Sequence, residues 1–82
     1  MLKGIVISNI VSTRKQASLV GSKFLEVRLI ENGQDTEKYV IAVDSVGAGI
    51  GETVLLTTGS SARLALHNTE APVDAVVVGI VD

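Results

Sequence analysis

The sequence has no cysteine, no tryptophan and a single proline, and Phe24 and Tyr39 are its only aromatic residues. Without cysteine the protein cannot form disulfides, bind a metal through thiolates or use a thiol as a nucleophile. A binder of single-stranded nucleic acid needs a basic surface and aromatic side chains on which bases stack. Here seven Lys and Arg oppose nine Asp and Glu, giving a formal net charge of −2. These absences argue against a disulfide-stapled domain and against a nucleic-acid partner.

Long hydrophobic segments are also absent. The longest apolar run, from Ala75 to Val81, is about a third of the roughly 20 residues that a membrane-spanning helix needs. We therefore expect a cytoplasmic protein that is neither exported nor inserted into a membrane. Because the chain has 82 residues and no long polar tract, residues 1–82 should form one domain.

Branched aliphatic side chains dominate the composition, because thirteen Val, eight Leu and seven Ile make up 28 of the 82 residues. This bias favours β-strands. A domain of this size buries only about 60% of the surface that its unfolded chain exposes. Some aliphatic side chains should therefore remain on the outside of the subunit, and small domains commonly cover such side chains by associating. The composition predicts self-association.

Five stretches have the pattern of strands. In the second, Leu25, Val27 and Leu29 alternate with polar residues, as in a half-buried strand, whereas the last stretch is apolar on both faces and needs a packing partner on each. We place the strands at residues 2–11, from 21–22 to 31, 37–44, 52–58 and 74–81. The predicted fold class is mainly all-β, a five-stranded, OB-like β-barrel with a short helix before the last strand.

Turn and cap residues separate these strands. Asn32-Gly33 is a strong turn signal, and we expect Gln34-Asp35 to extend the hairpin loop. After the fourth strand we expect a short helix over about residues 62–67, with Ser60 or Ser61 as its N-terminal cap and Asn68 at its end.

The glycine cluster Gly47-Ala48-Gly49-Ile50-Gly51-Glu52 is the most conspicuous motif. A dinucleotide-binding fingerprint would need Gly in place of Glu52, and a phosphate-binding loop would need Gly-Lys-Ser/Thr afterwards. The residues that follow also have a strand pattern, so no helix N-terminus is available to hold a phosphate. We interpret the cluster as a tight loop at which backbones pass close together, within the subunit or across an interface.

No recognisable catalytic motif is present. Neither Ser60 nor Ser61 has the glycine two residues later that a hydrolase nucleophile elbow requires, and the spacing does not bring His67 beside a serine and a carboxylate. A lone histidine at a helix end usually completes the last turn or faces solvent. Strand-end carboxylates are usually solvated or salt-bridged, which covers Asp44, Asp74 and Asp82. We expect that the protein is not an enzyme and that it has no cofactor and no metal site.

Six stretches, in order along nearly the whole chain, carry a family resemblance: Val11-Ser12-Thr13-Arg14-Lys15, Gly21-Ser22-Lys23-Phe24-Leu25, residues 42–52, Val54-Leu55-Leu56, Gly59-Ser60-Ser61-Ala62-Arg63, and residues 72–82 with their Val-Gly-Ile-Val-Asp ending. Together they resemble the EutN/CcmL family, the vertex proteins of bacterial microcompartments. The combination of the Asp-x-Val-Gly-Ala-Gly-x-Gly-Glu block with Gly-Ser-Ser-Ala-Arg is specific, although each motif alone would be weak.

The resemblance implies an OB-like barrel that assembles into a cyclic homopentamer and caps the five-fold corners of a polyhedral shell, in contact with hexameric and trimeric facet proteins. A catabolic compartment is expected more than a carboxysome. By family analogy, the central opening is lined by Gly59, Ser60 and Ser61, and the subunit contacts involve Gly47, Gly49, Gly51 and Arg63. Many relatives continue beyond the Ile-Val-Asp found here at Asp82, so contacts of such a tail would be missing or replaced. The alternative is an OB-type module that binds single-stranded nucleic acid or a small ligand.

Overall fold

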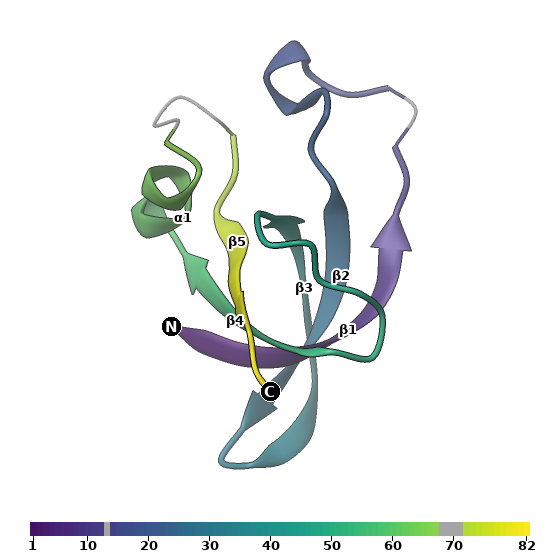
Figure 1. Cartoon of the computed structure of the whole chain (residues 1–82), viewed down its shortest axis with the longest axis vertical. Coiled ribbons are helices and arrows are strands. Elements are labelled where there is room, and N and C mark those ends of the chain that lie inside the picture. The colour runs from purple at the N-terminus through teal and green to yellow at the C-terminus, as the bar shows by residue number, and fades with distance from the viewer. Residues whose placement is uncertain (13, 68–71) are drawn as a thin grey trace.

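The computed structural model describes residues 1–12, 14–67 and 72–82, and most of these residues lie in strands. Figure 1 shows the strands wrapping around one another, with the short helix to one side of them. In chain order the elements are β1 (Leu2–Ile10), a single 3-10 turn (Ala17–Leu19), β2 (Phe24–Glu31), β3 (Gln34–Asp44), β4 (Thr53–Thr58), α1 (Ser60–Ala65) and β5 (Ala75–Ile80).

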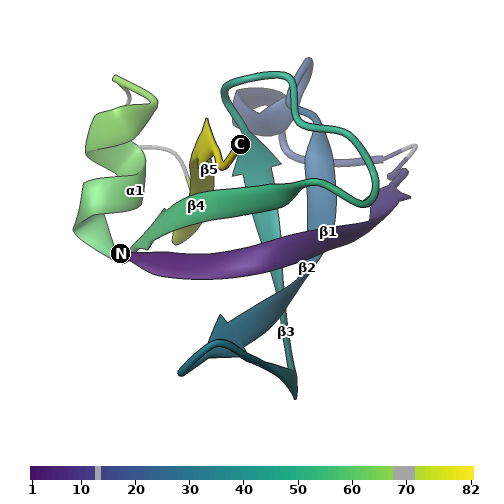
Figure 2. The same ribbon diagram turned by 60° about the horizontal axis from the view of Figure 1, so that its bottom comes forward.

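The five strands form a closed barrel in the order β1-β2-β3-β5-β4 (Figure 2). All neighbouring pairs are antiparallel except β3 and β5, which run parallel and pair only at Val43 with Val76 and at Asp44 with Val77. Because the first four strands are antiparallel neighbours, this single short ladder closes the barrel. The predicted five-stranded barrel, with its helix before the last strand, is confirmed.

The interior is apolar. The side chains predicted to share one face of β2, Leu25, Val27 and Leu29, are all buried. They belong to the larger of two hydrophobic clusters, whose buried members are Val6, Leu25, Val27, Leu29, Ala42, Ala48, Val54, Leu56, Ala75 and Val77. The strand alternation therefore has the predicted physical cause, which is removal of one face of each strand from water.

Strand β5 is buried on both faces over its first half, as predicted. Ala75 and Val77 point into the barrel, whereas Val76 lies in a second cluster outside it. The buried members of this second cluster are Val43, Ala62, Val73 and Val76. Helix α1 supplies Ala62, so the helix is the partner that covers the outer face of β5.

Two boundary predictions were wrong. Gln34 and Asp35 do not extend the hairpin loop, because Gln34 already pairs with Glu31 and β3 begins there. The turn is Asn32-Gly33 alone, with φ of 54° and 76° at these two residues, which is the two-residue geometry that matches strand twist. Helix α1 begins at Ser60 and not at Ala62, and the predicted stop at Asn68 lies outside the described residues.

A glycine that the sequence analysis did not single out packs tightly in the barrel wall. Gly4 lies in β1 opposite Leu29 of β2 and Val54 of β4. A β-carbon at this position would lie 2.4 Å from Cγ1 of Val27 and 2.6 Å from the backbone oxygen of Arg28. Only glycine lets β1 approach β2 this closely, since both distances are far below van der Waals contact.

Candidate assembly surfaces

The glycine loop, residues 45–52, connects β3 to β4. Gly47 and Gly51 have φ of 82° and 89°, a left-handed conformation that disfavours side chains, yet a β-carbon at either position would meet no other atom within 4 Å. Within the subunit these glycines therefore serve backbone conformation. Within the subunit, the close passage of two backbones that was expected at these glycines occurs at Gly4. A close passage across an interface stays a prediction.

Asp44, the last residue of β3, holds this loop in place. Its side chain is 2% exposed, and its carboxylate accepts hydrogen bonds from the backbone N–H groups of Val46, Gly47 and Ala48 at 3.1, 3.1 and 2.9 Å. Lys23 places its Nζ 3.7 Å from the same carboxylate and donates to the backbone oxygen of Ala48 at 2.9 Å. The carboxylate is therefore a structural anchor, and it is salt-bridged, as expected for a strand-end carboxylate.

The far end of the glycine loop is fixed as well. Glu52 accepts a hydrogen bond from the backbone N–H of Gly49 at 2.6 Å. The loop backbone also pairs with β1, because Gly51 donates to the oxygen of Val6 at 2.8 Å and Val6 donates to the oxygen of Glu52 at 3.0 Å. Between these anchors the side chain of Ile50 is 62% exposed. The loop thus presents an apolar side chain on a braced backbone.

The residues expected at the central opening lie at the start of α1. Gly59, with φ of 66° and ψ of −145°, occupies the cap position, and no side chain caps the helix. The predicted serine cap is therefore wrong, because both serines are already within the helix. Gly59, Ser60 and Ser61 are exposed and contiguous, so the fold brings this predicted set together at one end of the helix.

Arg63 lies on the same helix, one turn further on. Its Nη1 donates to the backbone oxygen of Val73 at 3.3 Å, and the residue is half-buried. This contact ties α1 to the segment that leads into β5. A guanidinium group carries five N–H donors, and within residues 1–12, 14–67 and 72–82 one of them is used, on the backbone oxygen of Val73. The fold does not bring Arg63 to the glycine loop, which follows a different strand.

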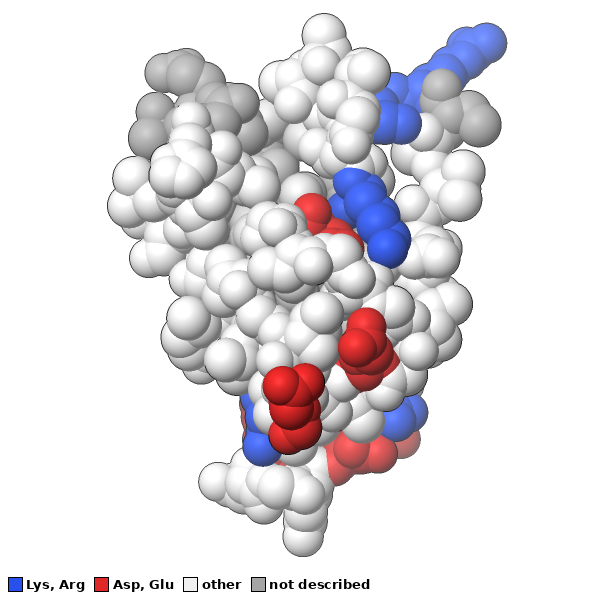
Figure 3. Space-filling model, in the orientation of Figure 1, with Lys and Arg blue, Asp and Glu red and all other residues white. Residues whose placement is uncertain are grey.

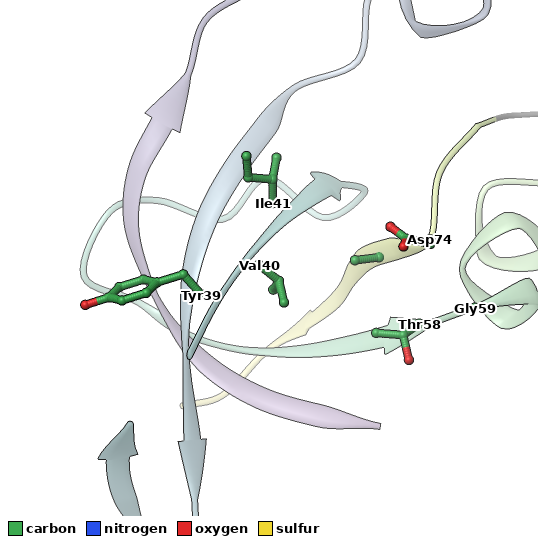
Figure 4. A pocket seen from close by; sticks show the side chains of 7 residues that line it. Tyr39, Val40, Ile41, Thr58, Gly59 and Asp74 are labelled. Atoms are coloured by element: carbon green, nitrogen blue, oxygen red, sulfur yellow. The ribbon is translucent and has the colours of Figure 1, made fainter. Parts of the chain in front are cut away.

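An apolar hollow of about 570 Å³ opens between β3 and the adjoining ends of β4 and β5. Figure 4 shows Val40 of β3 directed toward β4 and β5, with Thr58 and Asp74 across the opening. The lining residues are Tyr39, Val40, Ile41, Thr58, Gly59, Asp74 and Ala75. Tyr39 and Ile41 are 50% and 55% exposed, so an apolar stripe of β3 faces outward beside the hollow.

Further charged side chains form ion pairs on the β2–β3 hairpin. Two cross-strand ion pairs, Arg28 with Asp35 at 3.1 Å and Lys38 with Glu31 at 3.2 Å, brace the β2–β3 hairpin. On the face shown in Figure 3, the charges lie toward the lower end and the right side, and the rest of the described surface is mostly uncharged. No group of three or more His, Asp or Glu with metal-binding geometry occurs in the described ranges.

The remaining predicted candidates do not converge on a common site. His67 follows α1 with φ of 56° and is exposed, and its backbone N–H donates to the oxygen of Leu64 at 3.0 Å. Asp74 borders the hollow, and Asp82 is exposed at the end of the chain. None of the helices that the structure describes has the length and apolarity to cross a membrane.

These observations define a small closed β-barrel whose outside carries a braced loop and an apolar hollow, both suited to contact with another protein. Over residues 1–82 the chain matches the family model described as ethanolamine utilisation protein EutN/carboxysome. The chain belongs to the EutN/CcmL family, as its motifs indicated.

Curated relatives cover almost the whole chain. A carboxysome shell vertex protein CcmL from Gloeobacter violaceus is 49% identical over 80 residues, which is 96% of this chain and 80% of the relative. A bacterial microcompartment shell vertex protein EutN from Salmonella typhimurium is 43% identical, covering 100% of this chain and 84% of the relative. Both names describe shell vertex proteins, and neither names an enzyme.

Solved structures agree in fold. The CcmL structure from Gloeobacter violaceus matches with a TM-score of 0.94 and 47% identity, covering 100% of this chain and 86% of that one. The structure titled GrpN pentameric microcompartment shell protein, from Rhodospirillum rubrum, matches with a TM-score of 0.90 and 43% identity, covering 100% and 94%. The family is thus one of structural shell proteins that includes a pentamer.

Proposed function

We propose that this protein is a structural shell component, a cyclic homopentamer that caps the five-fold vertices of a bacterial microcompartment in the cytoplasm. The observation that carries the proposal is the match over the full chain to proteins named as shell vertex proteins, one of whose solved relatives is titled as pentameric. The composition supports the same conclusion, because a subunit with exposed Ile41, Ile50 and Leu64 gains by covering these side chains.

Ring geometry explains how such a subunit could serve a shell. Head-to-tail contacts between unlike faces close a ring when the rotation per subunit divides a full turn. A five-fold ring within a lattice of hexagons introduces curvature, which a flat hexagonal sheet lacks. The proposed function is therefore purely geometric: the angle between neighbouring subunits and the number of subunits in the ring set the curvature of the shell, and the protein catalyses no reaction.

Within this pentamer, we place Gly59, Ser60 and Ser61 around the central opening. Their exposure and their position at one end of α1 support the placement, since small exposed residues allow close approach around an axis. The glycine loop with Gly47, Gly49 and Gly51 belongs to the subunit contacts in this proposal. Its support is the braced backbone that carries exposed Ile50.

We also place Arg63 in a subunit contact, where its guanidinium group would meet a carboxylate of the neighbour. Arg63→Ala should weaken each contact by about 2–5 kcal/mol if the pair is desolvated. Arg63→Lys keeps the charge but loses the planar fork, so it should fall between the wild type and Arg63→Ala. Sedimentation equilibrium measures the association constants. Equal constants for all three proteins would remove Arg63 from the interface.

The proposed partners beyond the ring are the hexameric and trimeric proteins of the shell facets. The catabolic type of compartment stays a prediction, because CcmL proteins of carboxysomes are 42–51% identical and the PduN, EutN and GrpN proteins are 43–47% identical. Assembly with facet proteins of each type tests this prediction. The matching facet should form closed polyhedra only when the pentamer is added.

Native mass spectrometry tests the ring directly. With a subunit mass of 8.5 kDa, a pentamer has a mass of about 42 kDa (5 × 8.5). A stable monomer at micromolar concentration, or a ring with another number of subunits, would contradict the proposal.

Variants of Gly49 and Ser61 test their proposed positions at the subunit contact and the central opening. A bulky residue at either position should reduce pentamer formation more than it reduces barrel stability.

A further inference from the structure

We infer that Ile50, at the tip of the glycine loop of one subunit, inserts into the apolar hollow beside β3 of the next subunit and thereby fixes the direction of the ring. This inference rests on the proposed homopentamer, and it names the two unlike faces that meet. The occupant of the hollow is thus a second copy of this chain.

The inserting side is built to hold its shape. Asp44 accepts three backbone hydrogen bonds near the start of the loop, and Glu52 accepts one from Gly49 at its end. Ile50, 62% exposed, therefore lies on a backbone that loses little conformational freedom on binding. The side chains from Ser45 to Gly51 are all uncharged, and the nearby charges of Lys23 and Glu52 are already hydrogen-bonded to the loop backbone.

The receiving side combines an apolar hollow with an edge of β3 that forms no strand pairs in the described structure. The hollow is lined mainly by Tyr39, Val40, Ile41 and Ala75, and Asp74 is its single charged lining residue. Strand β3 pairs with β5 only at Val43 and Asp44, so before Val43 no described strand pairs with β3 on this side. Apolar anchors in desolvated pockets dominate binding energy at protein interfaces, and this hollow offers such a pocket.

The two sides face in different directions, as a ring contact requires. The glycine loop crosses in front of β2 and β3 in Figure 1, and it lies behind these strands in Figure 4, which looks onto the hollow. Loop and hollow thus lie on opposite sides of the barrel. A subunit cannot fill its own hollow with this loop, whereas a neighbour can, and repetition of the same contact closes a ring.

Two charge-introducing variants test the contact. Ile50→Glu removes the inserting side chain and Ile41→Glu places a charge at the hollow; both wild-type side chains are more than half exposed in the subunit, so both variants should fold. Each variant alone should associate at least about 30-fold more weakly per contact than the wild type. Val20→Glu is the matched control, because Val20 is 71% exposed but lies outside both surfaces, and it should still form pentamers.

Mixing the two variants gives the sharper result. The Ile41→Glu subunit keeps an intact loop and the Ile50→Glu subunit keeps an intact hollow, so one good contact can form between them. We expect a 1:1 dimer of about 17 kDa (2 × 8.5) by native mass spectrometry, whereas neither variant alone should give a dimer. Circular dichroism confirms that each variant is folded, and Ile50→Ser is the milder substitute if it is not.

The outcomes separate this inference from the proposed function. If the wild type is a pentamer and Ile50→Glu is still a pentamer of wild-type stability, the inference is wrong and the proposed ring stands. If the mixture contains only monomers, or if the two variants alone dimerise equally well, the pairing of loop with hollow is wrong. If the wild type itself is monomeric, the proposed homopentamer falls first.

Discussion

Gly4→Ala should be among the most damaging single-methyl changes that this barrel can receive. The added carbon would lie 2.4 Å from Cγ1 of Val27, which is fully buried, and 2.6 Å from the backbone oxygen of Arg28. Because one of these atoms belongs to the backbone, rotation of a side chain cannot relieve the overlap. Strand β1 would have to move away from β2, along a ladder that runs from Lys3 to Ile10.

The magnitude follows from two opposing effects. Overpacking a core costs about 1–3 kcal/mol, and we expect the upper end because the backbone is involved. Replacing glycine by alanine in a strand returns about 0.5–1 kcal/mol through lower entropy of the unfolded chain. The net loss is about 2–2.5 kcal/mol, which in a domain of this size lowers Tm by about 10–20 °C.

Gly79→Ala provides a matched control within the same barrel. A β-carbon on Gly79 would lie 3.6 Å from Cδ1 of Leu55, which is ordinary van der Waals contact. This variant should melt at the wild-type temperature or a few degrees above it. Both variants are measured by circular dichroism at one protein concentration, with the oligomeric state checked by sedimentation. Equal melting temperatures for Gly4→Ala and the wild type would refute the close-approach argument.

Three further predictions concern the glycine loop and the helix. Asp44→Ala should lower the free energy of unfolding, measured by urea titration, by about 2–3 kcal/mol, because it removes the charged acceptor of three backbone N–H groups. Asp44→Asn keeps one acceptor oxygen and should lower the free energy of unfolding by about half as much. Gly47→Ala and Gly51→Ala should each cost about 1 kcal/mol, since both require positive φ. Gly49→Ala should cost less by the same assay, because its β-carbon would only press on Oε1 of the Glu52 side chain at 3.3 Å. Arg63→Ala should lower the melting temperature of an isolated subunit by no more than about 4–8 °C, because the described bond to the backbone oxygen of Val73 contributes about 1 kcal/mol. A collapse of the fold would contradict this.

The strands could be predicted from the sequence because their cause is local. Alternation at Leu25, Val27 and Leu29 marks a half-buried strand, and the doubly apolar residues around Val76 mark one that is covered on both faces. The order in which the strands close the barrel is not local. The two-pair parallel ladder between β3 and β5 leaves no periodic signal, so the order of the strands was not predicted.

The same distinction separates the site residues that were predicted from those that were missed. Positive φ at Gly47 and Gly51 agrees with their predicted demand for unusual backbone, and the close approach of backbones within the subunit is at Gly4. An isolated glycine within the strand pattern of β1 was the available signal for that approach. The anchoring role of Asp44 also had a signal, since an aspartate before a turn commonly accepts backbone hydrogen bonds two residues on.

The short parallel ladder between β3 and β5 has a consequence for subunits that have not yet assembled. With only two residue pairs, it is the place where a lone barrel should part most readily, exposing amides to exchange and the chain to proteases. A neighbour seated in the adjacent hollow would clamp it shut. Unassembled subunits would then be degraded faster than subunits within a pentamer. This difference in turnover would keep the amount of vertex protein matched to the number of shells.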